Sequence, residues 1–248
     1  MTDDSRITCP EHGEADTTYV CRHLAENPEQ PWFCDSPTEE NRWPDAWCGQ
    51  CDAAFREKGE WNEHNEGATE IALLCHRCYE AGIASSVDAV SDDTRAAWKA
   101  LVRQCHDELG AKQEQLRAEF ALGEHKRWDY DQDTASLMFS NDGVPALIAE
   151  VEFIGSVSTR TGTWLWSWAN FHLLPNVRSR IAAVRAFGEE RGFPRLTVPK
   201  WDADEVDGWE VSGIAGKVLG ALGVYRVPTE YGFLYMAVMN MRDVRRTQ

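Results

Sequence analysis

Four short pairs of cysteine and histidine, all between residues 9 and 78, constrain this chain more than any other feature. They are Cys9-Pro10-Glu11-His12, Cys21-Arg22-His23, Cys48-Gly49-Gln50-Cys51 and Cys75-His76-Arg77-Cys78. Two closed tetrahedral zinc sites need eight ligands, and four pairs supply eight. We therefore expect two structural zinc ions, bound by Cys9, His12, Cys21, His23, Cys48, Cys51, Cys75 and Cys78.

The spacing leaves open which pairs share an ion, because each pair is too short to enclose a metal alone. We expect the pairs to interleave, the first with the third and the second with the fourth. The two ligand sets are then Cys9, His12, Cys48 and Cys51, and Cys21, His23, Cys75 and Cys78. Sequential sharing between neighbouring pairs is the alternative. Neither scheme leaves the open position that a catalytic zinc keeps.

The chain is acidic, and its charge is uneven. The formal net charge is −16; residues 1–85 hold 6 Lys or Arg and 18 Asp or Glu, which gives −12, and residues 86–248 carry the remaining −4. A negative field of this kind repels phosphate backbones, so a nucleic-acid partner is not expected even though zinc motifs often indicate one. A basic protein is the partner that this charge favours.

No apolar run approaches the roughly 20 residues that a membrane helix needs. The first residues lack the basic start and apolar stretch of a secretory signal, so we expect a cytoplasmic protein. Its thiols then stay reduced and bind metal rather than forming disulfides. Cys34 and Cys105 have no partner at ligand spacing. Cys105 is expected in the core face of a helix.

With 248 residues, the chain is long enough for two compact units. We expect a zinc-binding domain at 1–85, a linker at 86–93 and a second domain at 94–248. Ile71-Ala72-Leu73-Leu74 is expected to form a short buried strand that delivers the fourth ligand pair.

After the linker, the hydrophobic pattern alternates between helical and strand periods. A long helix is expected from a cap at Asp92 or Asp93 to Gly123, and a capping box, Asp202-Ala203-Asp204-Glu205, opens another. The remaining elements are strands at 135–140, 145–157 and 163–170, a helix from Asn176 to Gly192, and a hairpin at 224–228 and 233–239. The order predicts an α+β domain with helices packed on an antiparallel sheet.

Two stretches of this domain are candidate ligand or partner surfaces. In the predicted strand at 163–170, Trp164, Trp166 and Trp168 fall at period two and share one face, with Asn170 at the strand end. A helix covers these indoles if they are core; otherwise they line a groove. The second stretch, 202–210, carries five carboxylates, among them Asp202 and Asp204. They suit the start of a helix, or else a cation or acid/base site.

Several stretches resemble a family. They are Asp131-Gln132-Asp133, Gly162-Thr163-Trp164-Leu165-Trp166-Ser167-Trp168-Ala169-Asn170, Val184-Arg185-Ala186-Phe187-Gly188 and Trp201-Asp202-Ala203-Asp204-Glu205. Together they are similar to an uncharacterised bacterial domain family of unknown function, over about residues 95–243. The preceding part resembles two-zinc cross-brace fingers such as the B-box, or ubiquitin-binding zinc fingers. The short second pair, Cys21-Arg22-His23, departs from the usual two-residue spacing.

The sequence contains no phosphate-binding loop, no nucleophile elbow and no zinc-protease motif, so catalysis is not expected. We expect a non-catalytic, zinc-stabilised binding protein with a basic protein partner, in an immunity-like or regulatory role. The alternative is a small-ligand sensor or enzyme that uses the tryptophan strand and the acidic 202–210 segment.

Overall fold

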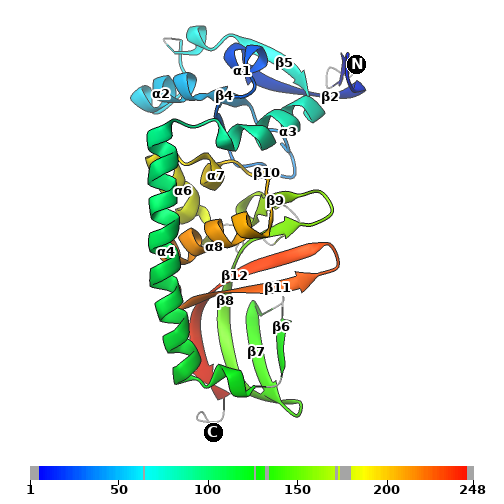
Figure 1. Ribbon diagram of the computed structural model, residues 1–248. Helices are drawn as coiled ribbons and strands as arrows, with labels where there is room; N and C mark the ends of the chain where they lie inside the picture. Colours follow the sequence, from blue (N-terminus) through cyan, green and yellow to red (C-terminus); the bar gives the residue numbers. More distant parts are fainter. Residues whose placement is uncertain are drawn as a thin grey trace.

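Two β-sheets and a long helix define the α+β fold of the computed structural model (Figure 1). The structure describes residues 6–63, 65–125, 127–131, 134–170, 173 and 180–244. Helix α4 (Asp92–Glu119) starts near the first sheet and runs along the second (Figure 1). Its 28 residues span about 42 Å at 1.5 Å per residue.

The first sheet has five strands in the order β1-β2-β4-β3, with β5 paired to β2. The strands are β1 (Arg6–Cys9), β2 (Gly13–Cys21), β3 (Trp32–Cys34), β4 (Ala46–Cys48) and β5 (Ile71–Cys75). Short helices α1 (Arg22–Glu26), α2 (Gly49–Lys58) and α3 (His76–Ser85) follow β2, β4 and β5 directly. Each of these three strands therefore ends at a cysteine that also begins a helix.

Strand β5 forms where the sequence predicts it, but it is not buried. Ile71 and Leu73 are 74% and 52% exposed, whereas Ala72 and Leu74, on the opposite face, are half-buried and pack against the core. Successive side chains of a strand point to opposite faces, so those of β5 alternate between solvent and the protein interior. A run of four apolar residues hid this alternation, because both faces carry apolar side chains.

The second sheet has seven strands and is antiparallel throughout. Its centre is the 15-residue strand β8 (Val144–Ser158), which pairs with β12 (Gly232–Asp243) on one edge. On its other edge β8 pairs first with β7 and then with β9. The other strands are β6 (Arg127–Asp131), β7 (Ser136–Asn141), β9 (Thr163–Trp166), β10 (Lys200–Asp202) and β11 (Gly223–Thr229).

Helices cover this sheet where small residues allow close packing. Helix α8 (Glu205–Leu219) lies against β8 and β12 and also contacts α4. A Cβ added to Gly208 in α8 would lie 2.7 Å from the Tyr235 ring, so glycine is what permits this approach. Helices α6 (Ala182–Arg191) and α7 (Pro194–Thr197) complete the layer.

The helix ends correct three sequence-based expectations. The cap of α4 is Ser91, whose Oγ accepts from the Thr94 N–H at 3.2 Å, rather than Asp92 or Asp93. The capping box of α8 uses Asp204 and Asp207, not Asp202 and Glu205. Helix α4 ends at Glu119 with Phe120 as its C-cap, rather than running to Gly123. Helices α6 and α8 end at glycines with positive φ, Gly192 as expected and Gly220. The expected cap at Asn176 lies outside the described residues.

The first sheet and the α8 layer share one hydrophobic core. A single cluster of buried residues includes Leu24 and Trp32 of the N-terminal part together with Trp166 and Val211 of the C-terminal part. The expected linker at 86–93 contributes too, since Val87 is 4% exposed and belongs to the same cluster. This segment is therefore not an exposed connection between two separate cores. A second cluster lies between β7, β8, β12 and the end of α4.

Candidate metal centres

The eight predicted ligands lie at turns and helix starts of the N-terminal part. Cys9 ends β1, and the turn after it carries His12 before Gly13 opens β2 with a φ of +67°. Cys75 ends β5 and caps α3, so that Cys78 falls in the first turn of that helix. The β1–β2 turn and the start of α3 are thus the two elements that present one set of ligands.

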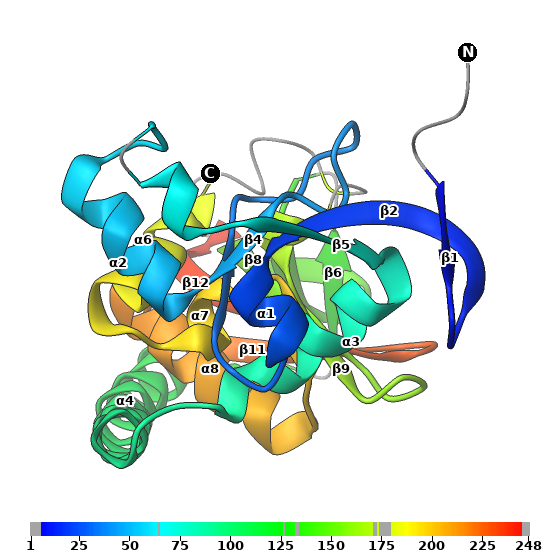
Figure 2. The ribbon, with the colours of Figure 1, turned by 90° about the horizontal axis from the view of Figure 1, so that it is seen from above.

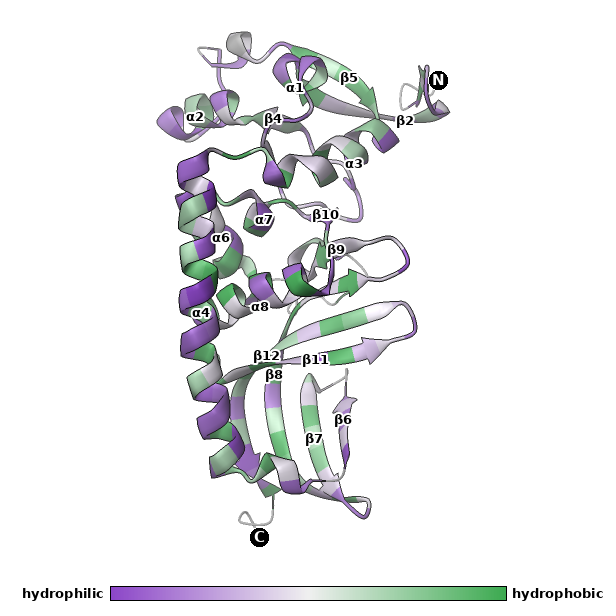
Figure 3. Cartoon of the chain, in the orientation of Figure 1, coloured by the Kyte–Doolittle hydropathy of each residue, from purple (hydrophilic) through white to green (hydrophobic). Residues whose placement is uncertain are grey.

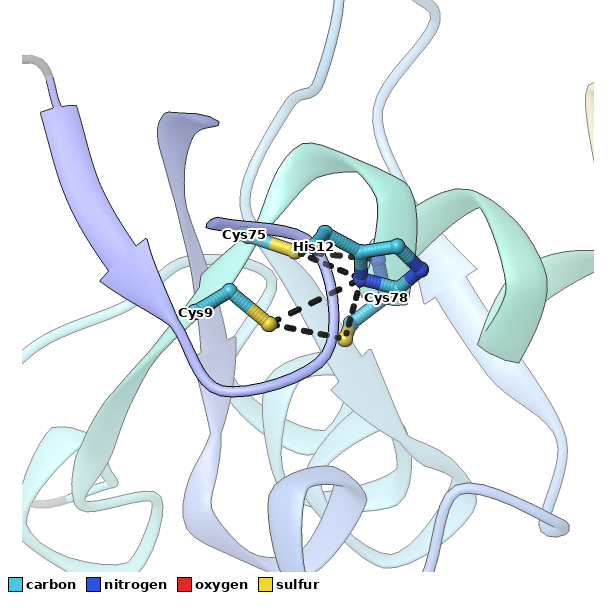
Figure 4. A group of neighbouring side chains, drawn as sticks. All are labelled: Cys9, His12, Cys75 and Cys78. Atoms are coloured by element: carbon cyan, nitrogen blue, oxygen red, sulfur yellow. Dashed lines mark hydrogen bonds between the residues drawn. The ribbon is translucent and has the colours of Figure 1, made fainter. Parts of the chain in front are cut away.

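Cys9, His12, Cys75 and Cys78 form the first group, which we call the outer cluster (Figure 4). Their side chains point toward a common centre (Figure 4). The three sulfurs of Cys9, Cys75 and Cys78 lie 3.6, 3.4 and 3.5 Å from His12 Nδ1, and the Cys9 and Cys78 sulfurs lie 3.7 Å apart. The sulfur separation excludes a disulfide, which needs about 2.05 Å.

These distances match the edges of a metal tetrahedron. With Zn–S of about 2.3 Å and Zn–N of about 2.0–2.1 Å, a regular tetrahedron places two sulfurs about 3.8 Å apart and a sulfur and a nitrogen about 3.6 Å apart. The observed separations of 3.7 Å and 3.4–3.6 Å agree with both values. The outer cluster therefore has the donor types and the spacing to hold a tetrahedral ion.

Cys21, His23, Cys48 and Cys51 form the second group, which we call the inner cluster. Their four donor atoms lie within 4.8 Å of one another, and Cys51 Sγ is 3.4 Å from His23 Nδ1. Cys21 and His23 come from the junction of β2 and α1, and Cys48 and Cys51 from the junction of β4 and α2. The two clusters account for all eight predicted ligands.

The pairing of the ligands differs from the interleaved expectation. The first pair joins the fourth, and the second joins the third, so the clusters are nested along the chain. The interleaved prediction was wrong because it considered spacing alone. The pairing of the strands determines which ligand pairs share a site. Strand β2 pairs antiparallel with β5, which brings the end of β5 back to the β1–β2 turn. The sequential scheme is excluded by the same geometry.

Backbone hydrogen bonds lower the pKa values of these thiols, and burial raises them. The Glu11 backbone N–H lowers the pKa of Cys9 to about 6. Burial raises the pKa of Cys78 to about 12 and also raises those of Cys21 and Cys51. Three thiolates cannot share so small a volume without a cation, so a bound divalent metal displaces the protons that these thiols otherwise keep.

Backbone hydrogen bonds within each cluster orient two of the sulfurs. The Cys78 N–H donates to Cys75 Sγ and the Cys48 N–H donates to Cys21 Sγ, both at 3.3 Å. His76 lies inside the fourth pair but is not a donor of either cluster, since its Nδ1 accepts from the Asp16 N–H at 3.1 Å.

The tryptophan strand is shorter than expected and buried. Strand β9 ends at Trp166, and Ser167–Ala169 form a 3-10 turn, so Trp168 does not continue the strand face. Trp164 and Trp166 are fully buried and Trp168 is 5% exposed. The Trp166 indole N–H donates to the Arg195 carbonyl at 2.9 Å. These three side chains are core rather than a groove, and Asn170 follows the turn half-buried.

The acidic segment 202–210 has structural contacts instead of a shared site. Asp204 accepts from the backbone N–H groups of Val206 and Asp207, at 2.7 and 2.9 Å. The guanidinium of Arg195 binds Asp207 at 2.5 Å and, across to the expected linker, Asp88 at 2.8 Å. Asp202 is exposed on β10, away from these contacts. Helix capping and ion pairing thus account for the carboxylates nearest the helix start.

Sequence reasoning missed one surface, formed by Tyr19, Ile71 and Leu73 on the exposed face of β2 and β5. The segment Thr17-Thr18-Tyr19-Val20 is rich in β-branched and aromatic residues and so favours a strand. It does not alternate between polar and apolar residues, so the sequence carried no signal for which face lies in solvent. None of the helices in the described ranges is long and apolar enough to cross a membrane.

The chain belongs to a family of unknown function, DUF6882, whose model matches residues 99–241. The match agrees with the similarity expected for about residues 95–243 and begins after the last metal ligand. Comparison with curated proteins and with solved structures found no match for either set. The metal clusters therefore rest on the geometry of this chain alone.

Proposed function

We propose that this member of the family is a non-catalytic binding protein, whose N-terminal part is built around two zinc ions and engages a basic protein partner. The role is of the immunity or regulatory type. The observation that carries the proposal is the presence of two complete sets of four protein donors, because a site with four protein ligands keeps no position for a substrate.

Zinc is the metal that the donor sets favour. Each cluster offers three cysteine sulfurs and one histidine nitrogen, and such soft tetrahedral sets select zinc over oxygen-binding cations such as magnesium or calcium. The zinc ions then stabilise the fold, since the part of the chain that holds them has few large buried side chains beyond Val20, Leu24, Trp32, Tyr79 and Ile83.

Charge supports a basic partner. Residues 1–85 carry −12 of the chain's −16, so a positively charged surface is attracted and a nucleic acid is repelled. The alternative function, a small-ligand sensor or enzyme, is less well supported. A hollow of about 460 Å³ beside the tryptophan strand is lined by Leu165, Lys200 and Asp202, but the tryptophans that this function requires are in the core and Asp204 caps α8.

The metal part of the proposal is tested by elemental analysis of the purified chain. We expect two zinc ions per chain, and fewer than about 1.5 contradicts the two-site reading. Removing zinc with a strong chelator should unfold the N-terminal part, visible as a change in the total tryptophan emission, to which the buried Trp32 contributes.

The partner is tested by affinity capture from the native host with the full chain as bait and the chelator-treated chain as control. We expect a basic protein that is retained only by the metal-loaded bait and elutes as salt rises, because screening weakens the attraction. A bait that retains no specific protein but carries a small molecule in native mass spectra contradicts the proposal.

A further inference from the structure

Strands β2 and β5 present an apolar face to solvent. Tyr19 lies directly opposite Leu73 in the register, so their side chains share this face, and Ile71 stands two residues along β5. Their exposed fractions are 43%, 52% and 74%. The strands lie at one end of the molecule, and no other helix or strand of the described residues lies over them (Figures 1 and 2). Figure 3 shows the hydrophobic character of β5 at this end.

This exposure is not explained by the needs of the fold. The opposite face of the same strands, with Val20, Leu74 and Ala72, already packs into the core. Three large apolar side chains next to one another on a surface are typical of a binding site, whereas single exposed ones are ordinary. Among the described strands, β5 pairs only with β2, so its outer edge is open as well.

An acidic hollow adjoins the apolar face. It has a volume of about 450 Å³, and Tyr19 belongs to its lining as well as to the apolar face. Four carboxylates and one guanidinium also line it, from Asp16, Glu39, Glu40, Asp45 and Arg42. Burial, and after it the Asp35 carboxylate, raises the pKa of Asp45. The hollow therefore favours a cationic group.

We propose that the exposed face of β2 and β5, together with this hollow, is the docking surface for a basic segment of a partner protein. The proposal rests on the proposed function and names where and how the partner binds. Apolar side chains of the segment cover Leu73 and Ile71, and a lysine or arginine beside them enters the acidic hollow next to Tyr19. A second copy of this chain is a poor occupant, because the two acidic ends repel each other.

The test uses two synthetic peptides of about ten residues, a length that an exposed strand face accommodates. One alternates leucine with lysine, and the other alternates serine with lysine, so both carry the same charge. Titration calorimetry at fixed salt measures their affinities for the intact, zinc-loaded chain. We expect the leucine peptide to bind about tenfold more tightly, equal to about 1.4 kcal/mol.

Matched variants locate the difference. In Ile71→Ser/Leu73→Ser, the preference for the leucine peptide should fall below about twofold, while the serine peptide binds as before. Val144→Ser, at a 65% exposed position in the second sheet, is the control and should keep the full preference. Zinc content of each variant confirms that the N-terminal part is folded. Glu39→Gln/Glu40→Gln should weaken both peptides alike.

Equal affinity of the two peptides for the native chain overturns the proposal, as does a preference that survives in Ile71→Ser/Leu73→Ser. Dimerisation that this variant abolishes also overturns it and identifies a second copy as the occupant. None of these outcomes affects capture of a basic partner by charge elsewhere, so failure of the docking surface is distinguishable from failure of the proposed function.

Discussion

Two double variants separate the nested pairing from the interleaved one, because each removes a different set of metal donors. Cys9→Ser/Cys78→Ser removes two donors of the outer cluster and none of the inner. Cys9→Ser/Cys48→Ser removes one donor from each. Serine keeps the approximate volume of cysteine but replaces the thiolate that zinc prefers.

Nested pairing predicts opposite results for the two proteins. The first should retain about one zinc per chain and the second close to zero, against about two in the native chain. Interleaved pairing reverses this order, since Cys9 and Cys48 would then share an ion. Sequential pairing leaves neither variant with a complete site. Gel filtration in a mild chelator followed by elemental analysis measures the zinc content.

The same variants should also differ in stability, because each loses a different set of metal donors. Zinc binding to a structural site contributes about 10–16 kcal/mol in small peptides, which is comparable to the whole unfolding free energy of about 5–15 kcal/mol for a typical domain. The outer cluster packs with Ala15 in a small core of its own, whereas the inner cluster belongs to the main core with Trp32. Loss of the outer ion should therefore unfold β1 locally, as seen by hydrogen exchange.

Loss of the inner ion should instead lower the main unfolding transition. Cys51→Ser tests this, because Cys51 is buried in the main core. The reasoning is refuted if Cys9→Ser/Cys78→Ser releases both ions, or if Cys9→Ser/Cys48→Ser retains one. It is also refuted if β1 exchanges at the same rate with and without the outer ion.

Three further predictions concern the shared core. Gly155→Ala places a Cβ 2.4 Å from the Trp164 ring, so the urea unfolding midpoint should fall by the equivalent of about 1–3 kcal/mol; Gly110→Ala, in α4 with no atom within 4 Å of the new Cβ, should raise it instead. Arg195→Met removes the ion pairs of that guanidinium with Asp88, Asp207 and Glu210, and thermal unfolding should show a loss of about 2 kcal/mol, with an unchanged zinc content. Burial raises the pKa of Cys105 from 9.0 to about 11, so the native state disfavours its thiolate. This thiol should leave the free energy of unfolding unchanged below pH 9 and lower it by about 2–3 kcal/mol as pH rises through 11. The Cys105→Ala variant should not show this decline.

The eight residues of the two clusters were predictable from the sequence because the chemistry of each pair is local. A cysteine and a histidine within three residues can present two donors to one ion whatever the rest of the chain does. Which pairs meet is not local, since it depends on the antiparallel pairing of β2 with β5 over more than fifty positions. The sequence carries no short-range signal for that contact, so spacing alone led to the interleaved expectation.

The second sheet was predictable in outline for a similar reason. Turn residues and alternation located β7, β8, β11 and β12, whose ends agree with the expected ranges to within four residues. Strand β6 was not predicted. The predicted strand at 163–170 is longer than β9, because Trp164, Trp166 and Trp168 keep a strand period through a 3-10 turn. Whether those indoles were core or surface depended on helices packed from elsewhere in the chain.

The nested order of the two clusters has a consequence for assembly. Closing the inner cluster joins Cys21 to Cys48, 27 positions apart, whereas closing the outer one joins Cys9 to Cys78, 69 positions apart. Loop entropy makes the inner closure easier by about 0.8 kcal/mol, and once made it shortens the remaining outer loop and lowers its cost by about 0.4 kcal/mol. In the interleaved scheme neither loop lies inside the other, so closing one loop would not shorten the other in this way. The chain is therefore expected to load metal from the inside outward, and a chain with one ion should carry it in the inner cluster.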